Sequence, residues 1–190
     1  MFTGIVEEIG IVKKFEVRRH LLTLSVYASK VLSGTKTGDS IAIDGVCLTV
    51  VKKGRGILTF EAMKETLETT TLKDFSAGRK VNLERALSAN SRFGGHFITG
   101  HVDQRGIVKQ ILKGKNYREL VFNVDKNLRK YIVRKGSICL NGVSLTVGRV
   151  LKDGFSVYLI PFTLKQTNLG ILKPGDGINI EVDLIARYIL

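Results

Sequence analysis

The sequence has no long apolar run and few cysteines. Its apolar residues come in short runs broken by charges, such as SIAIDGVCLTVV, and none approaches the roughly 18 to 20 residues of a membrane span. The opening MFTGIVEEIG lacks the basic and apolar regions of a signal peptide. Cys47 and Cys139 form no C-x-x-C pair and provide no disulfide framework. We therefore expect a soluble, cytoplasmic protein with reduced thiols and no membrane association.

Acidic residues are also scarce. Seventeen Asp and Glu against thirty Lys and Arg leave a formal charge of +13, which by itself suggests nucleic acid or another anionic ligand. The basic residues are scattered among predicted strands, however, and only nine Phe and five Tyr are available to stack bases. We favour a generally basic surface, with no nucleic-acid partner.

Motifs for metals and nucleotide cofactors are missing. His96 and His101 are five residues apart, which places them on opposite faces of a strand and makes them a poor pair for one metal ion. His20 lies in a charged segment and is expected to be solvated. No G-x-G-x-x-G, P-loop or nucleophile elbow is present. We expect no metal and no cofactor.

A tandem repeat organises the chain. DGVCLTV at 44 to 50 returns as NGVSLTV at 141 to 147, and matches continue at an offset of 96 near the start of each copy and 97 from residue 40 onward. A register kept over some 80 residues implies two copies of one fold. We place the boundary in 86–97, ALSANSRFGGHF, and predict domains at 1–88 and 97–190.

Each copy has the pattern of an antiparallel β-barrel. Runs rich in Val, Ile, Leu and Thr are broken every 8 to 12 residues by Gly, Asp, Lys or Ser. One segment in each copy, 64–75 and 163–172, has helical spacing and is expected to end at Gly78 or Gly175. The sequence predicts an all-β fold of two tandem Greek-key barrels, each with six or seven strands and a short helix.

Positions that differ between the copies are the candidates for chemistry. Cys47 and Ser144 are equivalent, and each is either a small core residue or a group beside a bound ring. His101 stands where the first copy has Ile5, which favours a role in proton transfer over a structural one. His96 has no such contrast and is interpreted as structural.

Two further charges occur in the second copy alone. Asp183 replaces Ala86 of the first copy, and Lys135 replaces Gly38. A carboxylate at a strand end is ordinarily solvated, and a lysine in so basic a chain is weak support for an anionic ligand. We keep Asp183 and Lys135 as candidate site residues alongside these simpler interpretations.

The motifs together resemble a known family. MFTGIVEE, DGVCLTV, MKETL, VNLERAL, GGHFITGHVD, IPFTLKQTNLG and INIEVDLIARY are similar, in order and spacing, to riboflavin synthases of the alpha-chain type. The resemblance implies two six-stranded barrels that each bind one 6,7-dimethyl-8-ribityllumazine. It implies a dismutation that moves a four-carbon unit between two such molecules, giving riboflavin and 5-amino-6-ribitylaminouracil without a cofactor.

The resemblance also implies partners. It points to a homotrimer with the active site between the N-barrel of one subunit and the C-barrel of its neighbour, and to an association with lumazine synthase. Family members commonly continue past the position of IARYIL into a C-terminal helix that helps form the trimer. The alternative of the same fold is a lumazine-binding antenna protein without enzymatic activity.

The resemblance assigns ligand contacts by motif. The first barrel would supply Gly4, Ile5, Val6, Cys47, Leu48, Thr49, Glu61, Ala62, Met63, Lys64, Glu65 and Thr66, with Phe2 and Ser40 close by. The second would supply Gly100, His101, Val102, Lys135, Ser144, Leu145, Thr146, Tyr158, Leu159, Ile160, Pro161, Phe162 and Thr163.

Four of these residues are the catalytic candidates. We expect His101 to act as base or relay, Ser144 with Asp183 to activate a hydroxyl or water, and Cys47 to give a supporting contact or act as a transient nucleophile. Glu61 departs from relatives that carry Asp there, which keeps the carboxylate but changes its reach.

Overall fold

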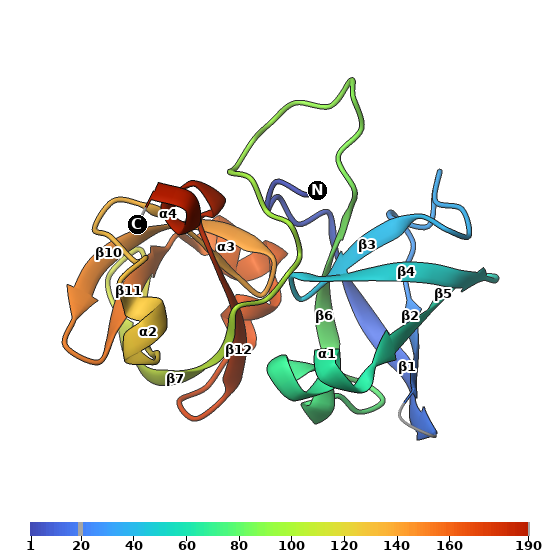
Figure 1. Ribbon diagram of the computed structural model, residues 1–190, viewed down its shortest axis with the longest axis horizontal. Helices are drawn as coiled ribbons and strands as arrows, with labels where there is room; N and C mark the ends of the chain where they lie inside the picture. The colour runs from blue at the N-terminus through green and yellow to red at the C-terminus, as the bar shows by residue number, and fades with distance from the viewer. Residues whose placement is uncertain (19–20, 190) are drawn as a thin grey trace.

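The computed structural model describes residues 1–18 and 21–189, so His20 lies outside the described residues. It consists of two closed, six-stranded antiparallel barrels that lie side by side (Figure 1), which confirms the predicted fold class. The first barrel has the strand order β1-β2-β5-β4-β3-β6 and the second β10-β11-β8-β7-β12-β9. The strands of the first barrel are β1 (Glu8–Arg18), β2 (Leu21–Tyr27), β3 (Ser40–Ile43), β4 (Val46–Lys53), β5 (Ile57–Met63) and β6 (Lys80–Arg85).

The second barrel repeats this arrangement strand for strand. Its strands are β7 (Gln104–Lys113), β8 (Arg118–Asn123), β9 (Ser137–Leu140), β10 (Val143–Leu151), β11 (Gly154–Leu159) and β12 (Gly177–Val182). In each barrel alternate side chains point inward, as the period of two along a strand requires; Leu58 and Phe60 of β5 and Phe155 and Val157 of β11 are completely buried. Each barrel therefore has its own apolar core.

The helical segments are shorter than predicted. α1 (Lys64–Thr69) and α3 (Pro161–Gln166) are each followed by a separate 3-10 turn, η1 (Thr71–Asp74) and η2 (Asn168–Ile171). Thr70 and Thr167 are extended between the two pieces, and each side-chain oxygen accepts a backbone N–H of the 3-10 turn. Gly78 and Gly175 do not end these helices, because they lie in the turns before β6 and β12. Two further short helices are α2 (Lys126–Arg129) and α4 (Leu184–Ile189).

The linker between the barrels has no strand of its own. Residues 86–103 arch beside the N-terminus (Figure 1), and Phe2 pairs with Ile98 in an isolated antiparallel bridge. Phe2 and Ile98 are completely buried and form a third small core with Ala42 and Cys139. The domain limits 1–88 and 97–190 stay a prediction, since the N-terminal residues pair with the linker.

A buried polar network joins the barrels around the two DG and NG turns. The Asn82 backbone N–H donates to Asp44 Oδ1 at 2.7 Å, and the Asn179 N–H donates to Asn141 Oδ1 at 2.9 Å. The Asn82 side chain then reaches across to the Asn141 carbonyl, and Asn179 to the Asp44 carbonyl, both at 2.8 Å. The repeated motif therefore builds the contact between the two barrels as well as two hairpins.

Candidate functional site

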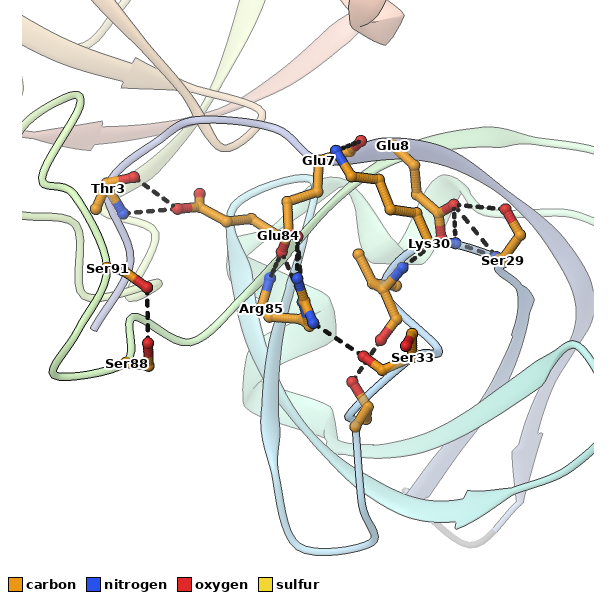
Figure 2. A network of polar contacts seen from close by, with 12 residues as sticks. Thr3, Glu7, Glu8, Ser29, Lys30, Ser33, Glu84, Arg85, Ser88 and Ser91 are labelled. Carbon is orange, nitrogen blue, oxygen red and sulfur yellow. Dashed lines mark hydrogen bonds and ion pairs between the residues drawn. The ribbon is translucent and has the colours of Figure 1, made fainter.

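Two short segments that carry predicted contact residues precede the first strand of each barrel. The first leader (residues 2–6) precedes β1, and the second leader (residues 98–102) precedes β7. The Glu84 carboxylate of β6 accepts hydrogen bonds from Thr3 N at 2.8 Å and Thr3 Oγ1 at 2.9 Å (Figure 2). It also accepts a hydrogen bond from Gly4 N at 3.0 Å. Glu181 of β12 holds Thr99 and Gly100 in the same way. Burial raises the pKa of both carboxyls, and the hydrogen bonds from the leaders partly offset it.

A row of charged contacts fixes the chain that follows the first leader. Arg85 pairs with the Glu7 carboxylate at 2.6 Å (Figure 2), and the hydrogen bonds from Arg85 hold the pKa of Glu7 below its usual value against the effect of burial. The Glu8 carboxylate accepts the backbone N–H groups of Ser29 and Lys30 at 3.0 and 2.7 Å. The entry to β1 is thereby tied to two other parts of the first barrel.

Each leader crosses to the opposite barrel, which corrects the expected grouping of contacts. Ser144 N donates to the Gly4 carbonyl at 2.9 Å, and Cys47 N donates to the Gly100 carbonyl at 2.9 Å. Val6 packs against the second core and Val102 against the first. The expectation that Gly4, Ile5 and Val6 belong with the first barrel's set, and Gly100, His101 and Val102 with the second's, is wrong. The cause is that the carbonyls of each leader pair with the free N–H groups of the other copy's strand.

The result is two equivalent composite surfaces. The first composite surface consists of Cys47–Thr49 of β4, residues 61–66 of β5 and α1, and the second leader. The second composite surface consists of Ser144–Thr146 of β10, residues 158–163 at the end of β11 and the start of α3, and the first leader. Leu48 points into its core, 4% exposed, while Thr49 lies on the outside, as strand alternation predicts. Both surfaces are open, and their exposed large hydrophobic residues are Ile5 (51%), Met63 (65%), Tyr158 (46%), Ile160 (59%) and Phe162 (70%).

Ser144 has a partner that sequence reasoning missed. Its Oγ lies 2.7 Å from Nδ1 of His96, a linker residue that is only 8% exposed. Burial lowers the pKa of His96, and the nearby Asp183 carboxylate opposes that shift. Asp183 itself accepts the Ile185 N–H at 3.0 Å at the start of α4, and among the described residues it makes no hydrogen bond to Ser144. Among the described residues Ser144 is therefore hydrogen-bonded to His96 and not to Asp183, and the shared role of Ser144 and Asp183 in activating a hydroxyl or water stays a prediction.

The remaining candidates lie in different surroundings. His101 is exposed and belongs to the second leader, so it lies on the first composite surface, and its backbone N–H donates to Thr99 Oγ1 at 3.1 Å. Cys47 is half-buried with a free thiol. Lys135 is exposed, with a left-handed φ of 66°. Phe2 is completely buried between the barrels.

A cavity of about 500 Å³ opens between the first barrel and the linker. Ile5 and Ser40 line it together with Glu84, Arg85 and Arg92. Most of the predicted ligand contacts lie outside this cavity on the open composite surfaces. Within residues 1–18 and 21–189 no group of three or more His, Cys, Asp and Glu is placed to hold a metal ion. None of the helices described is long and apolar enough to cross a membrane.

Comparison with known proteins bears on both surfaces. A family model described as the lumazine binding domain matches residues 3–86 and again 99–183. The chain is 42% identical to a riboflavin synthase of Bacillus subtilis (strain 168), covering 99% of this chain and 87% of the relative. It is 43% identical to the riboflavin synthase of Escherichia coli (strain K12), covering 96% of this chain and 87% of the relative. Among solved structures, LumP complexed with riboflavin superposes with a TM-score of 0.90 at 27% identity, over 96% of this chain and 99% of that one. LumP complexed with 6,7-dimethyl-8-(1'-D-ribityl) lumazine superposes with a TM-score of 0.87 at 26% sequence identity and the same coverage.

Proposed function

The chain belongs to the lumazine-binding family that includes the riboflavin synthases, and we propose that it converts two molecules of 6,7-dimethyl-8-ribityllumazine into riboflavin and 5-amino-6-ribitylaminouracil. The observation that carries the proposal is the pair of equivalent composite surfaces, one on each barrel. Two like surfaces suit two identical ligands. Their differences, Cys47 against Ser144 and Ile5 against His101, supply the unequal roles of donor and acceptor.

The residues mainly position the ligands and move protons. One lumazine takes up a nucleophile at C7 while the other loses a proton from its C7 methyl group, and the ring system delocalises the resulting charge. His101 serves as base or relay on the first composite surface, and Ser144 presents its hydroxyl on the second. Cys47 gives a supporting contact, and the other predicted contact residues bind the rings and ribityl chains.

The first test is product formation. Purified protein incubated with 6,7-dimethyl-8-ribityllumazine is expected to form riboflavin, with two lumazines consumed for each riboflavin, as followed by chromatography. Because a well-placed proton-transfer group contributes about 10²-fold or more, His101→Ala and Ser144→Ala should each lower kcat by that order. Turnover of both variants within about threefold of the unmodified chain would contradict these roles.

A lumazine-binding antenna is the second candidate, favoured by the superposition on LumP. The same incubation separates the two, since an antenna would retain the lumazine unchanged. Identities of 42 and 43% to riboflavin synthases against 27% to LumP support the enzyme.

The proposal includes a homotrimer in the cytoplasm that associates with lumazine synthase. The open composite surfaces support the trimer, because exposed Met63, Ile160 and Phe162 would be covered if a surface of one subunit faced that of its neighbour. Sedimentation equilibrium should give three times the 21.0 kDa chain mass. A monomer at the concentrations used for assay, with full activity, would contradict the shared site.

A further inference from the structure

His96 is fixed in place before any ligand arrives. Its backbone N–H donates to the Thr3 carbonyl at 3.2 Å, and its Nδ1 meets Ser144 Oγ at 2.7 Å. The residue before it, Gly95, passes so close that an added Cβ would lie 1.9 Å from the Thr3 oxygen and 3.0 Å from Ser144 Oγ. The linker can therefore reach Ser144 only because a glycine precedes the histidine.

The other imidazole nitrogen is buried without a hydrogen-bond partner. Nε2 of His96 has no partner among the described residues. Since burial disfavours the charged ring, the imidazole is neutral near pH 7, and only one of its nitrogens carries a proton. When that proton is on Nε2, the Ser144 O–H supplies the hydrogen of the 2.7 Å contact. Nδ1 is then left as the acceptor of the Ser144 O–H.

The equivalent position on the first composite surface has no such partner. Cys47 corresponds to Ser144, and among the described residues no imidazole is hydrogen-bonded to its sulfur. A thiol is intrinsically nucleophilic, whereas a serine hydroxyl needs a neighbouring base. The exchange of cysteine for serine thus coincides with the gain of a buried histidine.

We infer that His96 is a positioning residue whose Nδ1 accepts a hydrogen bond from the Ser144 O–H and so directs the Ser144 oxygen lone pairs toward the ligand on the second composite surface. The inference rests on the proposed function and deepens it. His96 acts through Ser144 and does not touch the ligand. It is distinct from His101, which lies exposed on the other surface.

A double-mutant cycle tests this dependence. His96→Ala is expected to lower kcat by about 10²-fold with a smaller change in KM, because the hydroxyl stays present but loses its orientation. In a Ser144→Ala background the same change should cost less than about threefold, since the group it acts through is gone. Equal losses in both backgrounds would overturn the inference. Asn90→Ala, at an exposed linker position, is the matched control and should leave kcat unchanged.

Two measurements keep the inference testable if His96→Ala folds poorly or the chain forms no riboflavin. His96→Asn places an amide near the Nδ1 position, so it should restore most of the kcat lost in His96→Ala. Nitrogen-15 NMR of the imidazole in the unmodified protein should show the proton on Nε2, whatever the activity. A proton on Nδ1 would overturn the inference, whereas absence of riboflavin with an Nε2 proton would count against the proposed function alone.

Discussion

Replacing Asp44 with asparagine is expected to stabilise the protein at pH 8 by up to about 4 kcal/mol. Asp44 is completely buried between the barrels, and burial raises the pKa of its carboxyl from 3.8 to about 7 despite hydrogen bonds from Asn82 N and Asn168 Nδ2. At pH 8 the folded protein must hold this carboxylate ionised. A rise of about three pKa units corresponds to about 4 kcal/mol at most.

The sign of the pH dependence follows from the raised pKa. Between about pH 4 and 7 the folded state keeps a proton that the unfolded state has lost, so this group's contribution to the free energy of unfolding falls as the pH rises and is constant above about 7. The asparagine variant should lack this component. Denaturant unfolding from pH 4 to 8 measures this component as the difference in the free energy of unfolding between Asp44→Asn and the unmodified chain. This difference should widen as the pH rises.

The second copy indicates that an amide fits this position. Asn141 is the counterpart of Asp44, and its Nδ2 donates to Asn168 Oδ1 at 3.4 Å. The counterpart of Asn168 is Thr71, whose Oγ1 is buried without a partner among the described residues, as is Asp44 Oδ2. Asp153→Asn, in the exposed turn between β10 and β11, is the control and should change stability little at any pH. Equal stability of Asp44→Asn and the unmodified chain from pH 5 to 8 would refute the expectation.

The fold was predictable because its signals are local and repeated. Strand alternation, turn residues and the 97-residue offset each act over a few residues, so the motif around Cys47 and its copy around Ser144 located two matching hairpins. The helix limits were wrong for a local reason too. The side chains of Thr70 and Thr167 cap a new 3-10 turn, which apolar spacing does not reveal.

The site was less predictable because its partners are distant in sequence. An offset pairs equivalent residues and therefore suggests that each leader contacts its own barrel. The crossing instead depends on the backbone carbonyls of Gly4 and Gly100, and because every residue has a backbone carbonyl, the sequence carries no signal for it. His96 contacts a serine 48 residues away. Its signal was the paired glycine of GGHF in an otherwise polar linker, since such a glycine marks a close approach of the backbone to something.

Replacing Gly100 with alanine is expected to separate the second leader from the first barrel and abolish most activity. Gly100 has a left-handed φ of 82°, and an added Cβ would lie 2.5 Å from Cys47 Cβ and 2.9 Å from Cys47 N. The peptide must shift, which breaks the hydrogen bond from Cys47 N to the Gly100 carbonyl and moves His101 away from the rest of the first composite surface. We expect a loss of about 3 kcal/mol in the free energy of unfolding, from backbone strain and the lost hydrogen bond, and a fall in kcat of about 10²-fold.

Gly78→Ala separates the effect of the leader from that of backbone strain. Gly78 has a similar φ of 89°, but an added Cβ there meets nothing within 4 Å. The control should therefore cost only the left-handed strain of about 1 to 2 kcal/mol and keep its kcat. Turnover and denaturant unfolding of both variants, measured at a temperature where each is folded, test the difference. If the two alanines lowered kcat equally, the crossing leader would have no part in the reaction.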